Sequence, residues 1–269
     1  MTEAGELDKA LIYQLSPART LQGATVVPSI DSSPRTATVP LGSGGTGAPA
    51  TAVLLYFSIR EKGRWCVGRA MVGMGFSGNT LPLGTHLCLI YDSETERERL
   101  LARFVGSGLA AGERVVYLAE KTTKTELAAL LGEMGIEVPE GSVTRSLEVE
   151  EAESVYCRDG VFCPRTMLEV LGQIQRETEA SGYPCLRATG DMSWALKGAK
   201  GSERLIEYEA LLNDLVAAQP FLAVCQYDAR RFDGQALYHV LQVHPFMIVR
   251  GRVLRNPAYI GPREFMKIL

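Results

Sequence analysis

The sequence predicts an α/β fold in which helices cover both faces of a mostly parallel sheet. From residue 84 onward, short apolar runs alternate with longer segments whose apolar residues recur at helical spacing. Runs such as Val115 to Leu118 are apolar without alternation, which is typical of strands buried on both faces. Strands of this kind, separated by helices, indicate a parallel sheet between two helical layers.

The expected elements follow in chain order. We expect strands at residues 86–91, 114–119, 184–189 and 221–227, and a further short strand at 143–147. We expect helices at residues 94–111, after a cap at Thr123, from about Pro164, and at residues 203–218 and 234–241. A hairpin at residues 246–254, turning near Arg250 and Gly251, would finish the sheet with an antiparallel edge.

The N-terminal part of the chain has a different composition. Residues 15–52 are rich in Ser, Thr, Pro and Gly, so they bury too little apolar surface to compensate for the entropy lost on ordering. We therefore expect residues 1–80 to be a largely disordered leader and residues 84–269 to be the folded domain. The glycine-rich run at residues 42–47 is expected to be a linker. Residues 52–59 and 65–76 are more apolar, and they form either short elements or an extension without a folded role.

Composition excludes several classes of protein. The 269 residues are 46% hydrophobic, with a net charge of -3, so there is no basic field to recruit nucleic acid or anionic lipid. The six cysteines show no pairs at two-residue spacing, which favours reduced thiols. No signal peptide or long apolar span is present in the sequence. We expect a cytoplasmic protein without direct contacts to nucleic acid or membrane.

The junction after the first predicted strand is the most informative stretch. Residues 87–98 pass from an apolar strand into an acidic helix start, with no glycine and no lysine between them. A phosphate loop places backbone amides and a Lys-Ser/Thr pair at this point. Carboxylates in the first helical turn suit the positive end of the helix but repel a triphosphate. The junction indicates a scaffold of the nucleotide-enzyme type that lacks its phosphate site.

An ordered set of motifs resembles one known family. The motifs are residues 86–92, Phe104 to Leu109, Gly112 to Tyr117, Gly190 to Trp194, Tyr208-Glu209, Cys225 to Asp228, His244-Pro245 and Asn256 to Tyr259. Together they resemble the MEDS family, the methanogen/methylotroph DcmR-type sensory domain, over about residues 84–266. The resemblance implies a RecA/KaiC-like three-layer fold without a functional phosphate loop. It also implies a role in sensing small hydrocarbon derivatives upstream of transcription or signalling. Because many relatives carry a fused output module and this sequence ends at Leu269, we expect the output to pass through a protein partner.

The predicted ligand site lies where three strands end. Ligands of open parallel sheets bind beyond the carboxyl ends of the strands, where loops and helix N-termini converge. We expect a cleft with aromatic faces and few polar groups, suited to a small organic ligand such as a one-carbon compound. The residues predicted for ligand binding are Tyr91, Asp92, Asp191, Met192, Trp194, Gln226, Tyr227, Asp228 and His244. The alternative is that the acids cap turns and that the aromatic residues belong to the core.

The other polar features predict no catalysis and no cofactor. Asp191 lacks the Lys and Ser/Thr that accompany a magnesium-holding acid, so we expect no catalytic residues. His239 and His244 are five residues apart and share no face, which argues against a metal site. Arg230, Arg231 and the charged residues from Glu94 to Arg103 are expected to form solvated pairs. The sequence leaves a Cys/His nucleophilic pair open.

The function predicted from these observations is a non-catalytic sensory or signalling domain. Binding of a small molecule would act through a protein partner in transcriptional or signal regulation, by favouring one arrangement of residues 191–201. Gly198 and Gly201 flank the mobile part of that segment. One alternative is an ATP-binding or ATP-hydrolysing enzyme with an atypical phosphate loop. Another is an adaptor domain that binds no ligand.

Overall fold

The computed structural model describes the backbone of residues 35–40, 51–56, 58–61, 64–67 and 70–269, and the side chains of residues 70–269. The chain divides into two compact units, residues 1–55 and 56–269. In the first, β1 (Arg35–Pro40) and β2 (Thr51–Tyr56) form a two-stranded sheet. In the second, β3 (Ser58–Glu61) and β4 (Arg64–Val67) pair antiparallel. Most of the predicted leader, including the linker at residues 42–47, lies outside the described residues.

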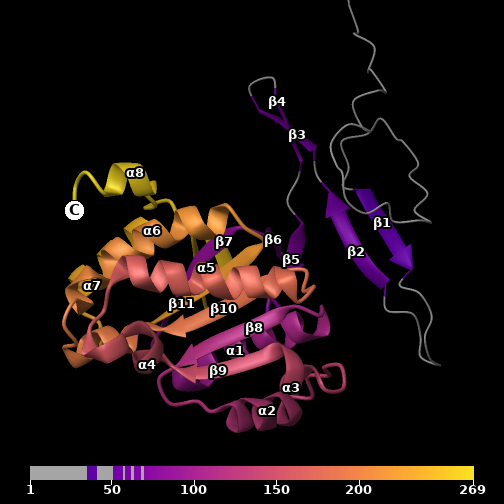
Figure 1. Ribbon diagram of the computed structural model, residues 1–269, viewed down its shortest axis with the longest axis horizontal. Helices are drawn as coiled ribbons and strands as arrows, with labels where there is room; N and C mark the ends of the chain where they lie inside the picture. The colour runs from indigo at the N-terminus through magenta and orange to yellow at the C-terminus, as the bar shows by residue number, and fades with distance from the viewer. Residues whose placement is uncertain (1–34, 41–50, 57, 62–63, 68–69) are drawn as a thin grey trace, which may run out of the picture. The chain divides into compact units, whose positions relative to one another are not determined.

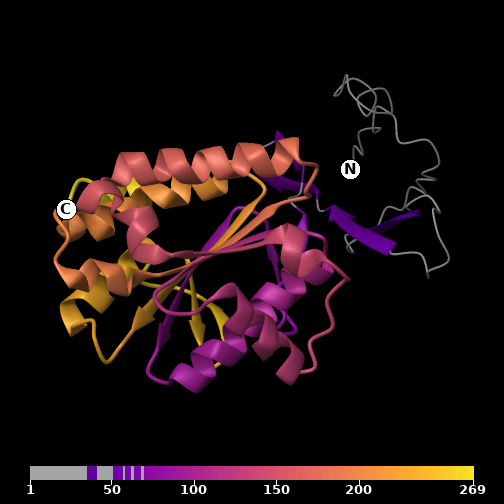
Figure 2. The ribbon, with the colours of Figure 1, turned by 60° about the horizontal axis from the view of Figure 1, so that its bottom comes forward.

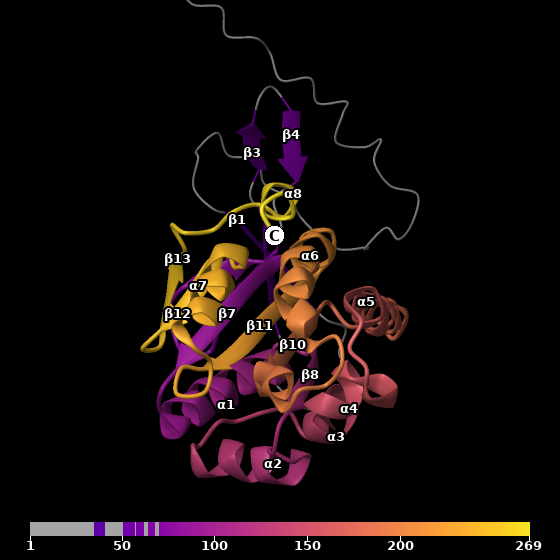
Figure 3. The ribbon, with the colours of Figure 1, turned by 90° about the vertical axis from the view of Figure 1, so that its left-hand side faces the viewer.

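A seven-stranded sheet organises the second unit and confirms the predicted fold class. Its order is β13-β12-β7-β11-β10-β8-β9, and Figure 3 labels the strands from β13 to β8. Only the β12–β13 pair of this sheet is antiparallel. The strands are β7 (Thr85–Tyr91), β8 (Arg114–Ala119), β9 (Leu147–Glu151), β10 (Leu186–Asp191), β11 (Phe221–Asp228), β12 (Phe246–Val249) and β13 (Arg252–Arg255). The antiparallel hairpin forms the C-terminal edge, as the sequence predicts.

Helices cover both faces of this sheet (Figures 1 and 2). On one face, α1 (Glu94–Ala110) and α2 (Lys124–Glu133) pack over the strands. On the other face lie α5 (Pro164–Ala180), α6 (Leu205–Ala217) and α7 (Gly234–Val243). The shorter helices are α3 (Ser142–Ser146), α4 (Ala152–Tyr156) and α8 (Pro262–Phe265). Among the described residues, no helix is long and apolar enough to cross a membrane.

Each buried strand sends alternate side chains into two separate cores. In β11, every residue is buried. Leu222 and Val224 pack towards α1 and α2, whereas Ala223, Cys225 and Tyr227 pack towards α5 and α6. Successive side chains of a strand point to opposite faces, so a strand covered on both sides is apolar throughout. The uninterrupted apolar runs of the sequence therefore predicted the layers correctly.

Two local predictions differ from the structure. Residues 143–147 were expected to be a strand, but α3 (Ser142–Ser146) occupies most of that stretch and β9 begins only at Leu147. Gly141, with a φ of 72°, turns the chain into the helix, and pairing with β8 starts where Leu147 lies opposite Val115. The helix expected at residues 203–218 begins at Leu205, after a short 3-10 turn, η4 (Ser202–Arg204).

The folded unit extends upstream of residue 84. β5 (Met71–Gly73) and β6 (Thr80–Pro82) form an antiparallel pair, and Met74 is fully buried in the core beside α1. The Gly73 carbonyl accepts hydrogen bonds from Ser107 Oγ at 3.3 Å and from the Arg187 guanidinium at 3.1 Å. Residues 70–80, which fall within the expected leader, therefore pack against the domain, and β5 is one of the short elements that the sequence left open for residues 65–76.

The N-terminus of α2 offers a direct test of a predicted cap. The Thr123 side chain accepts from the Glu126 amide, and the Glu126 carboxylate accepts from the Thr123 amide at 2.8 Å. We expect Thr123→Ala to lower the free energy of unfolding by about 1 kcal/mol, because the Glu126 amide loses its acceptor and the Glu126 carboxylate loses the hydroxyl donor. Urea denaturation followed by circular dichroism measures the loss. Thr125→Ala, inside the same helix and exposed, is the control; an equal loss in both variants would contradict the capping role.

Candidate functional site

A cleft of about 820 Å³ lies at the carboxyl ends of three neighbouring strands. Tyr91 ends β7, Asp191 ends β10 and Asp228 ends β11, and all three side chains line the cleft. Its remaining walls come mainly from α1, α2 and the loops after β8 and β11. Because the carboxyl ends of parallel strands meet at one edge, residues distant in sequence converge there. The sequence also predicted a cleft at the carboxyl ends of these three strands.

Six of the residues predicted for ligand binding do not line this cleft. Asp92 is exposed outside it, and the others are buried: Met192, Trp194, Gln226, Tyr227 and His244. For Tyr227 the physical reason is the alternation of side chains along a strand, whereas Gln226 shares the face of Asp228 but is buried against Arg97, to which it is hydrogen-bonded. Met192 and Trp194 lie in the 3-10 helix that follows β10, and His244 follows α7. Tyr91, Asp191 and Asp228 project on the same side of the sheet as α1, whereas Tyr227 projects towards α6. The prediction grouped consecutive residues that the pleat sends to opposite faces.

The aromatic residues expected in the cleft form part of the core instead. Trp194 lies in the 3-10 helix η3 (Met192–Lys197), stacked on Tyr156 with ring centroids 4.9 Å apart and close to Phe162 at 4.5 Å. Tyr227 donates a hydrogen bond from its hydroxyl to the buried Glu209 carboxylate. Both positions match the alternative that these rings are core residues.

Charged side chains dominate the cleft in place of aromatic faces. The lining contains seven carboxylates against four cations: Glu94, Glu98, Glu120, Glu126, Glu133, Asp191 and Asp228, with Arg97, Lys121, Arg230 and Arg231. Arg230 pairs with both Asp228 and Glu94 at 2.7 Å, and Arg231 pairs with Glu120 at 2.8 Å. The Arg230–Glu94 pair joins the loop after β11 to α1, and the Arg231–Glu120 pair joins it to the loop after β8. These pairs therefore belong to the cleft wall, although the sequence predicted only solvated pairs.

Arg97 connects the cleft to the interior of the sheet. Its guanidinium is almost fully buried, lies 5.4 Å from the centre of the Tyr91 ring, and donates to Tyr117 Oη at 2.8 Å and Gln226 Oε1 at 3.2 Å. Gln226 Nε2 then donates to Thr189 Oγ1 at 2.8 Å. No sequence signal separated Arg97 from the other charged residues of the helix, because its burial depends on the strands beneath it.

The two acids at the strand ends have opposite electrostatic environments. Burial raises the pKa of Asp191, although its carboxylate accepts from the Ser193 amide at 2.9 Å. Hydrogen bonds from Arg230 lower the pKa of Asp228. Burial also raises the pKa of the Tyr91 phenol. The cleft therefore combines a carboxyl whose pKa is raised by burial with one whose pKa is lowered by an ion pair.

The junction between β7 and α1 is short. Asp92 and Ser93 connect Tyr91 directly to the first helical residue, and the Ser93 side chain accepts from the Glu96 amide. The Glu94 carboxylate pairs with Arg97 at 2.8 Å and with Arg230 at 2.7 Å. A side-chain cap and paired carboxylates therefore form the start of α1 at the carboxyl end of β7.

Comparison with known structures gives distant similarity. A KaiC-like protein from Pyrococcus horikoshii is 13% identical, with a TM-score of 0.49 over 67% of this chain and 80% of that chain. The flagellar accessory protein FlaH from Methanocaldococcus jannaschii is 12% identical, with a TM-score of 0.49 over 68% of this chain and 83% of that chain.

Sequence comparison is more specific. Residues 85–245 match the family model described as MEthanogen/methylotroph, DcmR Sensory domain. The transcriptional repressor DcmR of Methylorubrum extorquens is 25% identical over 172 residues, which are 62% of this chain and 61% of the repressor. The chain thus spans less than two thirds of the repressor's length. Because the family model covers more than half of the sequence, the chain belongs to the MEDS family of sensory domains.

Proposed function

We propose that this chain is a non-catalytic sensory domain that binds a small organic ligand in the strand-end cleft. The observation that carries the proposal is the convergence of Tyr91, Asp191 and Asp228 on one cleft, together with Arg97 and Arg230. Concave sites that contain a few convergent polar groups, including carboxyls with shifted pKa values, are typical of ligand binding. The ligand class proposed from the family resemblance is a one-carbon or other simple hydrocarbon derivative.

The electrostatics of the cleft support sensing over nucleotide hydrolysis. Seven carboxylates against four cations disfavour a polyphosphate, and the three arginines of the lining are each paired with a carboxylate. Asp191 accepts a backbone amide at the start of η3 instead of standing beside a lysine and a Ser/Thr of a phosphate loop. We therefore also propose that the nucleotide site of this fold is degenerate and does not hydrolyse a nucleotide.

The route from ligand to partner is proposed to run through η3. The Asp191 side chain caps this 3-10 helix, so a ligand that contacts Asp191 bears directly on its first turn. At its other end, Lys197 pairs with Glu153 at 2.7 Å, and Leu196 is 43% exposed. A population shift of residues 191–201 would change this surface. Since DcmR is a transcriptional repressor, we propose transcriptional or signal regulation through a protein partner as the output.

A thermal-shift screen tests the ligand site. We expect at least one compound in a panel of one-carbon and halogenated metabolites to raise the Tm of the full chain, and this rise to disappear in Arg231→Gln, which removes a cleft cation. Arg263→Gln, an exposed arginine on α8, is the matched control and should keep the rise. A panel without any shift, while a pull-down recovers a partner, would support the ligand-free adaptor instead.

Calorimetry with Mg-ATP separates the sensor from the enzyme alternative. We expect no heat of binding at micromolar concentrations. A triphosphate at the β7–α1 junction would face carboxylates, which repel it, in place of the amides and lysine that bind phosphate. Micromolar binding, accompanied by phosphate release that is lost in Asp191→Ala, would overturn the sensory proposal in favour of an ATPase.

A further inference from the structure

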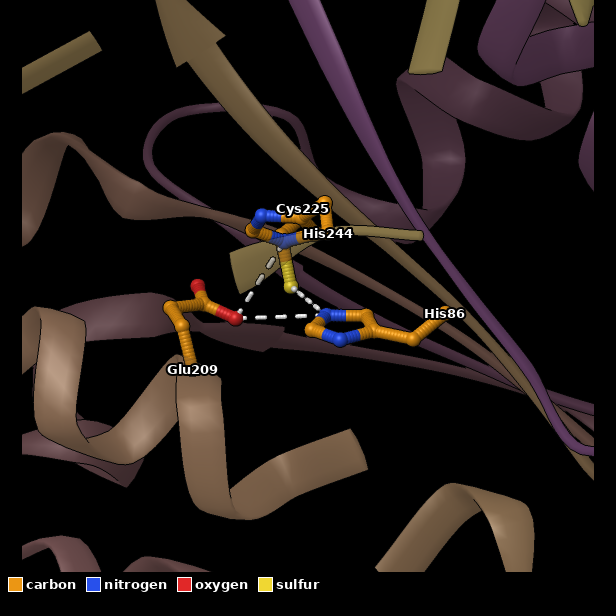
Figure 4. Close-up of side chains that lie close together, drawn as sticks. All are labelled: His86, Glu209, Cys225 and His244. Carbon is orange, nitrogen blue, oxygen red and sulfur yellow. Dashed lines mark hydrogen bonds and ion pairs between the residues drawn. The ribbon is translucent and has the colours of Figure 1, made fainter. Parts of the chain in front are cut away.

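Four side chains with metal-binding atoms converge in the core, on the face of the sheet covered by α6. They are His86 on β7, Glu209 on α6, Cys225 on β11 and His244 just after α7 (Figure 4). All four are buried, and one ligand atom from each lies within 4.8 Å of the others. This cluster is separate from the strand-end cleft, and the proposed sensory function does not use it.

The hydrogen bonds around the cluster fix the tautomers of both histidines. His244 Nδ1 lies 2.7 Å from the Val240 carbonyl oxygen, so Nδ1 carries a proton and donates. Asn213 donates its amide to the carbonyls of Glu209, Ala210 and Val243, which leaves its Oδ1 to accept from His86 Nδ1 at 3.3 Å. In the neutral imidazoles, both Nε2 atoms therefore point lone pairs into the cluster.

Three of the facing atoms carry lone pairs, and the Cys225 thiol, 3.3 Å from His86 Nε2, is only a weak proton donor. Glu209 Oε2 lies 3.2 Å from His86 Nε2 and 3.4 Å from His244 Nε2. Its second oxygen already accepts from Tyr227 Oη. Glu209 Oε2 and His244 Nε2 are both buried without a hydrogen-bond partner among the described residues. Protonating both imidazoles would place two cations 4.2 Å apart beside one carboxylate, which is costly in a buried site.

The separations suit one small cation at the centre. Bonds of about 2.0 to 2.3 Å in a tetrahedral zinc site place neighbouring ligand atoms about 3.3 to 3.8 Å apart. The distances here are 3.2 Å and 3.4 Å from Glu209 Oε2 to the two imidazoles, and 3.3 Å from His86 Nε2 to Cys225 Sγ. The remaining separations are at most 4.8 Å, so the four ligand atoms must draw together by up to about an ångström to reach ordinary bond lengths.

The charges and donor types select the ion. The thiolate and the carboxylate together carry two negative charges, which neutralise a divalent cation. The filled site then has no net charge, so no unpaired charge is buried. Nitrogen, sulfur and oxygen donors in a closed four-ligand set are typical of structural Zn²⁺. The Tyr227 hydroxyl, the Val240 carbonyl and Asn213 supply the outer hydrogen bonds that orient such ligands.

We propose that His86, Glu209, Cys225 and His244 bind one Zn²⁺ ion in a closed structural site. The ion joins β7, β11, α6 and the segment after α7, so its binding contributes to the stability of the fold. The sequence analysis expected no metal because these ligands are spread along the chain without any close pair. Their convergence is a property of the folded sheet and its covering helices.

Metal analysis of the purified full chain tests the site. We expect about one equivalent of zinc per chain after expression with added zinc, and its loss in Cys225→Ser and His244→Asn. Cys185→Ser and His239→Asn are the matched controls and should keep the zinc, since neither residue belongs to the cluster. A strong chelator should lower the Tm of the wild type but not that of Cys225→Ser.

Cobalt gives a second measurement that does not depend on the folding of a variant. Added to metal-free wild-type protein, Co²⁺ should produce the visible bands of a tetrahedral site and a thiolate charge-transfer band, which zinc then abolishes. If the wild type contains no zinc, shows no cobalt spectrum and keeps its Tm with chelator, the proposal is overturned. The four residues would then be a hydrogen-bonded network of protonated groups. The cleft experiments above remain independent of either result.

Discussion

Replacing Arg187 by Met is expected to lower the free energy of unfolding by about 3 to 5 kcal/mol, because it leaves a buried carboxylate without its counter-ion. Arg187 is 1% exposed and Glu113 is 2% exposed. The guanidinium donates to both Glu113 oxygens, at 2.5 Å and 3.1 Å, and to the Phe104 and Gly73 carbonyls at 3.1 Å. Removal of one side chain therefore breaks hydrogen bonds to β5, α1 and the loop before β8 together.

A double-mutant cycle separates the ion pair from the packing of the side chains. Glu113→Gln combined with Arg187→Met should cost less than the sum of the two single changes, since no charge then remains buried. Urea denaturation monitored by far-UV circular dichroism supplies the free energies, and Arg187→Lys serves if Arg187→Met does not fold. Additive losses, or a loss below about 1 kcal/mol for Arg187→Met, would show that the pair is not formed as described.

The same ion pair accounts for a glycine in α1. A Cβ atom on Gly108 would lie 2.7 Å from Arg187 Nε and 2.8 Å from Arg187 Cδ. Gly108 thus makes room for the guanidinium inside the helix face that packs on the sheet. The glycine at this position is therefore a packing feature of α1.

Trp194→Ala is expected to lower the free energy of unfolding by about 3 to 5 kcal/mol, because it leaves a cavity in the core between the sheet and the helices that cover it. Trp194 is fully buried and contacts the Tyr156 and Phe162 rings. Its indole N–H has no hydrogen-bond partner among the described residues. Trp194→Phe retains an aromatic ring and removes this unsatisfied donor, so it should be considerably less destabilising.

Circular dichroism during urea denaturation measures both variants. Tyr238→Ala, which truncates a side chain that is 58% exposed, is the control and should change the free energy by less than about 0.5 kcal/mol. Near-equal stabilities of Trp194→Ala and the control would contradict the buried position. This residue is also unsuited as a probe of ligand binding, since its loss would act on folding before it acted on the cleft.

Much of the fold follows from local signals in the sequence. Thr123 with Glu126 fixes the start of α2, and Pro164 occupies the first turn of α5. Arg250 and Gly251 both adopt positive φ at the predicted hairpin turn. The exception is residues 143–147, where a single turn of helix precedes a short edge strand. Segments this short carry too few residues to show a period, so pairing with β8 decided the boundary.

The sequence by itself determined the layers, the strand ends and membership of the MEDS family, because apolar runs, caps and ordered motifs are properties of neighbouring residues. Only the tertiary structure decided which strand-end residues share a cleft. A strand that is apolar on both faces has no alternation from which to read its orientation, so Tyr91, Asp191 and Asp228 could not be separated from Tyr227 beforehand. The convergence of His86, Glu209, Cys225 and His244 likewise required the packing of α6 and α7 on the sheet.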